Sequence, residues 1–246
     1  MRRIAAVLGL LLATSAPAGC GGGAGSGSSS VQATPTTPPG ETAPPPVQRP
    51  RRPVRIAALG DSITAGSPLW DPSPRVRARA PDQLNDQSQY EYWAARRLGP
   101  HARFANCGVF GERTDQIARR LERCAAAAQV LIVQGGINDI AQGRSVRAAA
   151  DDLRAMVRRG RALGLTVVLT DVLPWNNGGA RAAAQIARLN ARIRRIARDE
   201  HVPLLPFHDT LADPARPGRM RAEWTTDGDH PNVMGYRRLG EVVTLP

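Results

Sequence analysis

Short apolar runs alternate with longer helical patterns from Val54 to Pro246. Each run is about five to seven residues long, which suits a strand that is buried on both faces of a parallel sheet. Parallel strands need long crossover connections, normally through a helix. The alternation therefore predicts an α/β domain with a five-stranded parallel sheet and helices on both faces. The predicted strands are Val54–Leu59, Ala102–Asn106, Val130–Gln134, Leu165–Asp171 and Val202–Pro206.

Helices are predicted in the connections between these strands. Gly99-Pro100 and Gly164 are helix stop signals, and Ser145 is a favourable N-terminal cap. The predicted helices are Ser88–Leu98, Thr114–Ala127, a helix from Ser145 that Gly164 ends, Arg181–Glu200, and a last helix that His230-Pro231 introduces.

The N-terminal segment has the order of a bacterial export signal. Arg2 and Arg3 precede the apolar run Ile4–Ala13, and small residues follow it. This run is too short to span a bilayer. Residues 1–19 are therefore predicted to be a signal peptide, and the protein is expected to be exported.

Two cleavage patterns compete after the apolar run. Ala16-Pro17-Ala18 fits an ordinary signal peptidase site, which would release a secreted protein. Ala18-Gly19-Cys20 is similar to the lipobox of bacterial lipoproteins. We favour a lipid anchor on Cys20 that holds the protein to the outer face of the membrane, because a tether follows directly.

Residues 20–53 are a predicted linker rich in Gly, Ser, Pro and Thr. Its Pro-rich part, residues 34–53, should be extended and reach roughly 60 Å. Such a tether would hold the folded domain of residues 54–246 away from a membrane.

The charge balance does not indicate a nucleic-acid partner. The chain has 33 Lys and Arg residues, all of them Arg, against 21 acidic residues, and a formal net charge of +12. The absence of Lys and the abundance of Ala point to the codon bias of a GC-rich genome, so an anionic membrane or cell surface is the better expectation. Three Cys exclude a disulfide scaffold. No His and Cys cluster suggests a metal, no cofactor is expected, and we expect a monomer.

Four polar blocks follow predicted strands. They are Gly60-Asp61-Ser62-Ile63-Thr64, Asn106-Cys107-Gly108-Val109-Phe110-Gly111, Gly135-Gly136-Ile137-Asn138-Asp139 and, beyond a loop after the fifth strand, Asp227-Gly228-Asp229-His230-Pro231. The carboxyl ends of parallel strands meet at one edge of a sheet, so the blocks should line one crevice. One such block is a weak signal, but four in this order are specific.

These blocks resemble those of the SGNH, or GDSL, hydrolases, which are serine esterases and lipases of flavodoxin-like three-layer α/β/α fold. The resemblance covers residues 54–246. It implies Ser62 as the nucleophile, with Asp227 and His230 as the catalytic pair. It also implies Ser62, Gly111 and Asn138 as oxyanion donors. Gly111 is assigned from its spacing after Asn106, with Gly108 as the alternative.

Ester cleavage needs these residue types. A Ser hydroxyl attacks effectively only if a base takes its proton, and histidine has its ordinary pKa near neutrality. Asp227 lies three residues before His230 and could hold ring Nδ1, which leaves Nε2 for Ser62. Backbone N–H groups and the Asn138 amide could stabilise the oxyanion. Asp61 and Asp139 are predicted to be structural.

The expected function is therefore an exported serine esterase. Residues 67–87 follow the nucleophile closely and contain few large apolar side chains, so short-acyl or sugar-linked esters are the expected substrates. Candidates for the rim around such a small-molecule or glycan ester, with packing under loops as the alternative, are Trp70, Trp175, Asn176 and Trp224. The alternative functions are a lysophospholipase or thioesterase-like hydrolase, a glycan acyltransferase, and a non-catalytic envelope-binding protein on this fold.

Cys107 and Cys124 flank a predicted helix, and the sequence leaves their pairing open. A continuous helix of about 12 residues would separate its ends by roughly 15 Å, too far for a disulfide. An exported compartment, however, favours oxidation.

We predict that the chain with Cys20 fractionates with membranes in a bacterium that processes lipoproteins, whereas Cys20→Ala is released. A lipid on this residue is the proposed anchor. Immunoblots of membrane and soluble fractions measure the distribution. Equal release of both forms would favour cleavage after Ala18.

Overall fold

The computed structural model describes residues 53–79 and 81–245. The predicted signal peptide, nearly all of the linker and the candidate anchor Cys20 lie outside these residues. None of the helices in the described part combines the length and the apolar character that a membrane crossing requires.

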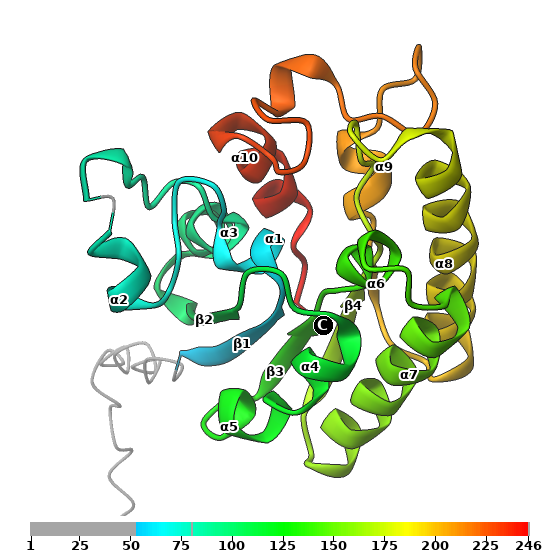
Figure 1. Ribbon diagram of the computed structural model, residues 1–246. Coiled ribbons are helices and arrows are strands. Elements are labelled where there is room, and N and C mark those ends of the chain that lie inside the picture. The colour runs from blue at the N-terminus through cyan, green and yellow to red at the C-terminus, as the bar shows by residue number, and fades with distance from the viewer. Residues whose placement is uncertain (1–52, 80, 246) are drawn as a thin grey trace, which may run out of the picture. The chain divides into compact units, whose positions relative to one another are not determined.

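Five parallel strands form one sheet in the order β2-β1-β3-β4-β5 (Figure 1). The strands are β1 Val54–Gly60, β2 Ala102–Gly108, β3 Val130–Val133, β4 Thr166–Thr170 and β5 Leu204–Leu205. The predicted five-stranded parallel sheet is confirmed. β5 is shorter than predicted, because Pro203 and Pro206 flank it and cannot donate to the strand ladder.

Helices cover both faces of the sheet, so the predicted three-layer α/β/α fold is confirmed. Side chains of β1 alternate between the two layers: Ala57 and Leu59 pack with one core cluster, and Ile56 and Ala58 pack with the other. Figure 1 shows α7 and α8 on one flank of the sheet, and α3 and α10 on the other. The first layer contains α4 Thr114–Ala118, α5 Leu121–Ala125, α7 Val146–Ala162 and α8 Gly179–Asp199, and the second contains α3 Tyr90–Leu98, α9 Phe207–Leu211 and α10 Val233–Val242.

The remaining helices are short and lie in the connections. They are α1 Ser62–Ala65, α2 Pro74–Arg77, α6 Ile137–Ala141 and the 3₁₀ turns η1 Pro81–Gln83, η2 Gly99–His101 and η3 Ala222–Trp224. Ser145 caps α7 as predicted, since its hydroxyl accepts from the N–H of Ala148 at 3.1 Å.

The prediction of one continuous helix over Thr114–Ala127 is wrong. The chain breaks into α4 and α5, with Arg120 between them. The Arg120 guanidinium donates to the carbonyls of Cys107 and Gly60, at 2.7 and 3.0 Å, and so holds the break against the ends of β1 and β2. The break brings the α-carbons of Cys107 and Cys124 to 6.0 Å, and the two residues form a disulfide.

Candidate active site

Ser62 begins α1 directly after β1. One oxygen of Asp61 caps this short helix by accepting from the N–H of Ile63 at 2.9 Å. The side-chain oxygen of Gln134, which follows β3, accepts from the N–H of Asp61 at 3.1 Å and from the hydroxyl of Thr64 at 2.9 Å. A Cβ on Gly60 would lie 2.4 Å from this oxygen, so only glycine fits there. The turn that presents Ser62 is therefore fixed from both sides.

His230 and Asp227 reach Ser62 from the loop before α10. His230 Nδ1 lies 2.8 Å from Asp227 Oδ2, and His230 Nε2 lies 3.1 Å from Ser62 Oγ. Because the carboxylate can only accept, Nδ1 carries the ring proton. Nε2 is then the acceptor for the Ser62 hydroxyl, which is the arrangement that general-base catalysis requires.

Asp227 is held as a carboxylate. Burial tends to raise its pKa, but the N–H groups of His230 and Asp229 and the His230 ring donate to it and hold the pKa below its usual range. The hydroxyl of Thr225 donates to the carbonyl of His230 and accepts from the N–H of Gly228. These bonds close residues 225–230 into one turn that keeps Asp227 on Nδ1 of His230 and Nε2 of the same ring on Ser62.

Gly111 and Asn138 lie on two segments that meet beside α4. Asn138 Nδ2 donates to the carbonyl of Glu112 at 3.0 Å, which fixes the orientation of the amide next to Gly111. Gly111 has φ of +76°, a conformation that favours glycine. Within residues 53–79 and 81–245, the N–H of Gly111 makes no hydrogen bond, whereas the N–H of Gly108 donates to Asn106 Oδ1. The free donor favours Gly111 over Gly108 as an oxyanion ligand.

A buried ion-pair network connects the segments that carry Gly111 and Asn138. Asp139 accepts from both the N–H and the hydroxyl of Thr114, each at 2.9 Å. Arg144 Nη1 lies 2.6 Å from Asp139 and 2.7 Å from Asp152. Asp139 therefore ties α6 to the start of α4, in agreement with its predicted structural role.

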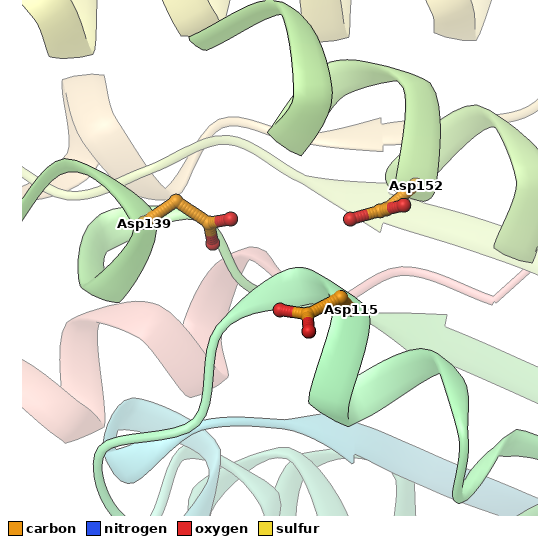
Figure 2. A group of neighbouring side chains, drawn as sticks. All are labelled: Asp115, Asp139 and Asp152. Atoms are coloured by element: carbon orange, nitrogen blue, oxygen red, sulfur yellow. The ribbon is translucent and has the colours of Figure 1, made fainter. Parts of the chain in front are cut away.

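Asp115, Asp139 and Asp152 also form a cluster of carboxylates whose oxygens lie within 4.8 Å (Figure 2). Guanidinium groups already neutralise it: Arg144 pairs with two of the carboxylates, and Arg113 pairs with Asp115 at 3.0 Å. The cluster is therefore a salt-bridge network, and we assign no cation to it.

An apolar hollow of about 260 Å³ adjoins the turn that carries Ser62. Ser67 lines it, and the N–H of Ser67 donates to the carbonyl of Ser62 at 3.0 Å. Phe110 also lines it, with its ring centroid 5.9 Å from that of His230. The other lining residues are Pro68, Trp70, Asp71, Val76, Arg77, Gln83 and Leu84, so the segment after the nucleophile forms most of its wall.

The four rim candidates have different surroundings. Trp70 lines the apolar hollow. The Trp175 indole N–H donates to Asp229 Oδ1 at 2.6 Å, beside Asp227 and His230. The amide of Asn176 is engaged with the backbone of Met220, and Trp224 packs on the second core cluster and against the guanidinium of Arg221. Packing accounts for the last two residues.

Sequence reasoning missed three residues that shape the site. It places Gln134 only in a strand and Phe110 only in a polar block, and it gives Arg144 no role. Phe110 and Arg144 carry no local signal, because each acts through a partner that is distant in sequence. An uncommon polar residue at the end of an apolar strand, such as Gln134, is the one signal that could have been followed.

Asp61 is fully buried, and only one of its oxygens is hydrogen-bonded within the described residues. Burial raises the pKa of Asp61 to about 6, against the opposing effect of the hydrogen bond from Ile63. The residue next to the nucleophile is therefore costly to ionise.

Comparison with known proteins agrees with this geometry. The model of the GDSL-like lipase/acylhydrolase family matches residues 58–238. None of the curated proteins compared is a significant sequence match. Among solved structures, a lipolytic protein of the G-D-S-L family from Desulfitobacterium hafniense DCB-2 is 17% identical with a TM-score of 0.64, over 77% of this chain and 97% of its own. A mutant of Axe2, an acetyl-xylooligosaccharide esterase from Geobacillus Stearmophilus, is also 17% identical with a TM-score of 0.61, over 78% and 92%. Both likenesses show a shared fold.

We predict that Asp61→Asn stabilises the protein above pH 6. The raised pKa means that the folded chain keeps this proton between about pH 4 and 6 while the unfolded chain loses it, so wild-type stability falls as pH rises through this window. Asn keeps the acceptor for Ile63 but cannot ionise. The variant should gain up to about 3 kcal/mol in the free energy of unfolding at pH 7.5 and almost nothing at pH 4, by urea unfolding. If the difference in the free energy of unfolding between variant and wild type were the same at both pH values, ionisation of Asp61 would not be its cause.

Proposed function

The chain belongs to the GDSL-like lipase/acylhydrolase family, and we propose that it is a serine esterase with Ser62 as its nucleophile. The family consists of ester hydrolases of the esterase and lipase type. The observation that carries the assignment to Ser62 is the row of hydrogen bonds from Asp227 through His230 to its hydroxyl, at 2.8 and 3.1 Å. The contact between His230 and Ser62 joins residues 168 apart in sequence, and packing alone does not require this contact to align with the contact between Asp227 and His230.

In the acylation step, Ser62 Oγ attacks the ester carbonyl carbon while its proton moves to His230 Nε2. The imidazolium that forms is balanced by Asp227, which the surrounding donors keep ionised. The carbonyl π electrons move onto oxygen, and that oxyanion can accept from the N–H of Ser62, the N–H of Gly111 and the Asn138 amide.

Collapse of the tetrahedral intermediate breaks the bond to the alcohol oxygen. His230 returns its proton to that oxygen, and the alcohol leaves an acyl group on Ser62. Water then gives its proton to His230 Nε2 as it attacks the acyl carbon, and the carboxylic acid is released with the proton back on Ser62. Water is the one co-reactant of this scheme, and it enters in the second half.

We place the acyl group of the substrate in the apolar hollow beside Phe110. Its volume of about 260 Å³ and its partly exposed wall residues Val76 and Leu84 suit a short chain. Acetyl to butyryl esters are therefore the proposed substrates. The fold shared with an acetyl-xylooligosaccharide esterase supports a sugar-linked ester as one natural form.

We also propose that the enzyme works outside the cytoplasm as a monomer. The support is the sequence of residues 1–53, with its export signal, its cysteine at the cleavage boundary and its Pro-rich tether. A tethered domain would act on esters of the cell envelope or its surroundings.

We predict that Ser62→Ala lowers kcat for p-nitrophenyl acetate by about 10⁴ or more and abolishes labelling by a fluorophosphonate probe. Asn138→Ala should lower kcat by about 10² to 10³ with KM little changed, because its amide would act mainly on the oxyanion. Steady-state kinetics and mass spectrometry of the labelled protein are the measurements. Ser73→Ala is the control and should match wild type. A label on another residue of folded protein would reject Ser62.

We predict a preference for acyl chains of two to four carbons, measured as kcat/KM over p-nitrophenyl esters of two to sixteen carbons. Each buried methylene should add about fourfold until the hollow is full. Phe110→Ala should lower the ratio of butyrate to acetate hydrolysis, whereas Leu163→Ala, at another exposed apolar residue next to the end of α7, should not. A maximum at twelve carbons or more would instead indicate a lysophospholipase or lipase.

A further inference from the structure

A second hollow, of about 320 Å³, lies between α6 and the first turns of α8. It differs from the apolar hollow in position and in charge: none of its described lining residues is acidic, whereas Asp71 as well as Arg77 lines the apolar hollow. Its wall offers an indole, a guanidinium and an amide. Its lining residues are Ile140, Ala141, Gly143, Trp175, Gly178, Arg181, Ala182 and Gln185.

This hollow borders the proposed catalytic residues on two sides. Ile140 and Ala141 belong to α6, the five-residue helix that also carries Asn138. Trp175 donates to Asp229, whose own N–H donates to the catalytic Asp227. The apolar hollow is lined instead by Phe110 and by eight residues between Ser67 and Leu84, so none of the described lining residues is common to the two hollows. An ester bound at Ser62 therefore has a separate space available for its alcohol part.

The wall of the second hollow carries positive charge without a counter-charge. Arg181 is exposed, and none of the described residues that line the hollow is acidic. In the part of the chain that the structure describes, neither Arg181 nor Gln185 has a salt-bridge or hydrogen-bond partner through its side chain. Both side chains are thus available to a ligand.

The same face of α8 continues the positive charge. Arg188, Arg192 and Arg195 follow Arg181 at spacings of 7, 11 and 14 residues, which place them within one stripe of the helix. All three are exposed, and among the described residues none forms a salt bridge. The stripe extends about 20 Å from the hollow. Repeated cations in a row fit a ligand with repeated negative charges.

We propose that the second hollow binds the alcohol part of the substrate, and that this part is a sugar of an acidic glycan. The indole of Trp175 offers an apolar edge to a sugar ring, Gln185 can bond its hydroxyl groups, and Arg181 pairs with a carboxylate or phosphate. Neighbouring acidic sugars would follow the arginines along α8. The proposal rests on the proposed esterase function and specifies its substrate class.

The test compares two glycan esters on the same enzyme: an acetylated oligogalacturonide, which is acidic, and an acetylated xylo-oligosaccharide, which is neutral. The acidic ester should have a kcat/KM about tenfold higher or more at low salt, and high ionic strength should reduce this preference. Arg181→Gln should lower the ratio of acidic to neutral hydrolysis about tenfold. Arg198→Gln makes the same charge change on the same helix about 26 Å away, and it should leave the ratio unchanged.

Equal rates on the two glycans, or equal loss in Arg181→Gln and Arg198→Gln, would overturn the proposal. A binding assay separates this outcome from failure of the esterase assignment. Polygalacturonate in a native gel should retard Ser62→Ala, and the added Arg181→Gln change should remove most of this retardation. Arg181-dependent binding to phosphatidylglycerol vesicles without retardation by polygalacturonate would also reject the glycan, in favour of a membrane surface. If the wild-type protein does not hydrolyse p-nitrophenyl acetate, the proposed esterase function is rejected, whatever the result of the native gel.

Discussion

The position of Ser62, the proposed nucleophile, depends on the hydrogen bonds that the side-chain oxygen of Gln134 accepts. β1 and β3 pair in register up to Leu59 and Val133, so Gln134 leaves the sheet beside Gly60. Its oxygen then accepts hydrogen bonds from both the N–H of Asp61 and the hydroxyl of Thr64. A buried acceptor with two donors resists displacement, because any movement of the turn would leave polar groups unpaired in a dry interior. The register in which β1 and β3 pair therefore determines the backbone geometry at Ser62.

The segment from the end of β2 to Gly111, the proposed oxyanion donor, needs separate restraints, because β2 is an edge strand. Three independent connections hold it: the disulfide of Cys107 to α5, the Arg120 guanidinium on the ends of β1 and β2, and Asp139 on Thr114. Between these points lie Val109 and Phe110, which are 39% and 63% exposed and add little packing of their own. The segment can therefore present an apolar ring to a substrate while its glycine N–H stays in place.

Residues with local signals were predictable, and residues that act across the fold were not. The strands could be located because buried parallel strands are short, continuous and apolar, and the four blocks could be placed at one edge because parallel strands share a direction. The break between α4 and α5 could not, because the apolar spacing of Ile117 and Leu121 satisfies one long helix. What ends α4 is the reach of Arg120 to carbonyls 13 and 60 residues away. The pairing of Cys107 with Cys124 depended on that same break.

Two carboxyl groups close to Ser62 have pKa values that shift in opposite directions, because their surroundings differ. Asp227 is partly exposed and accepts from two backbone N–H groups and the His230 ring, which keep its pKa low. Asp61 is fully buried with one backbone donor, and its pKa rises to about 6. Asp227 therefore ionises without the cost in stability that Asp61 incurs, and it is the one that faces Nδ1. Asp61 also interacts with a charged His230, so an imidazolium formed during acylation would favour its ionised form. A carboxyl that is costly to ionise at rest thus becomes less costly at the moment when a positive charge develops beside the nucleophile.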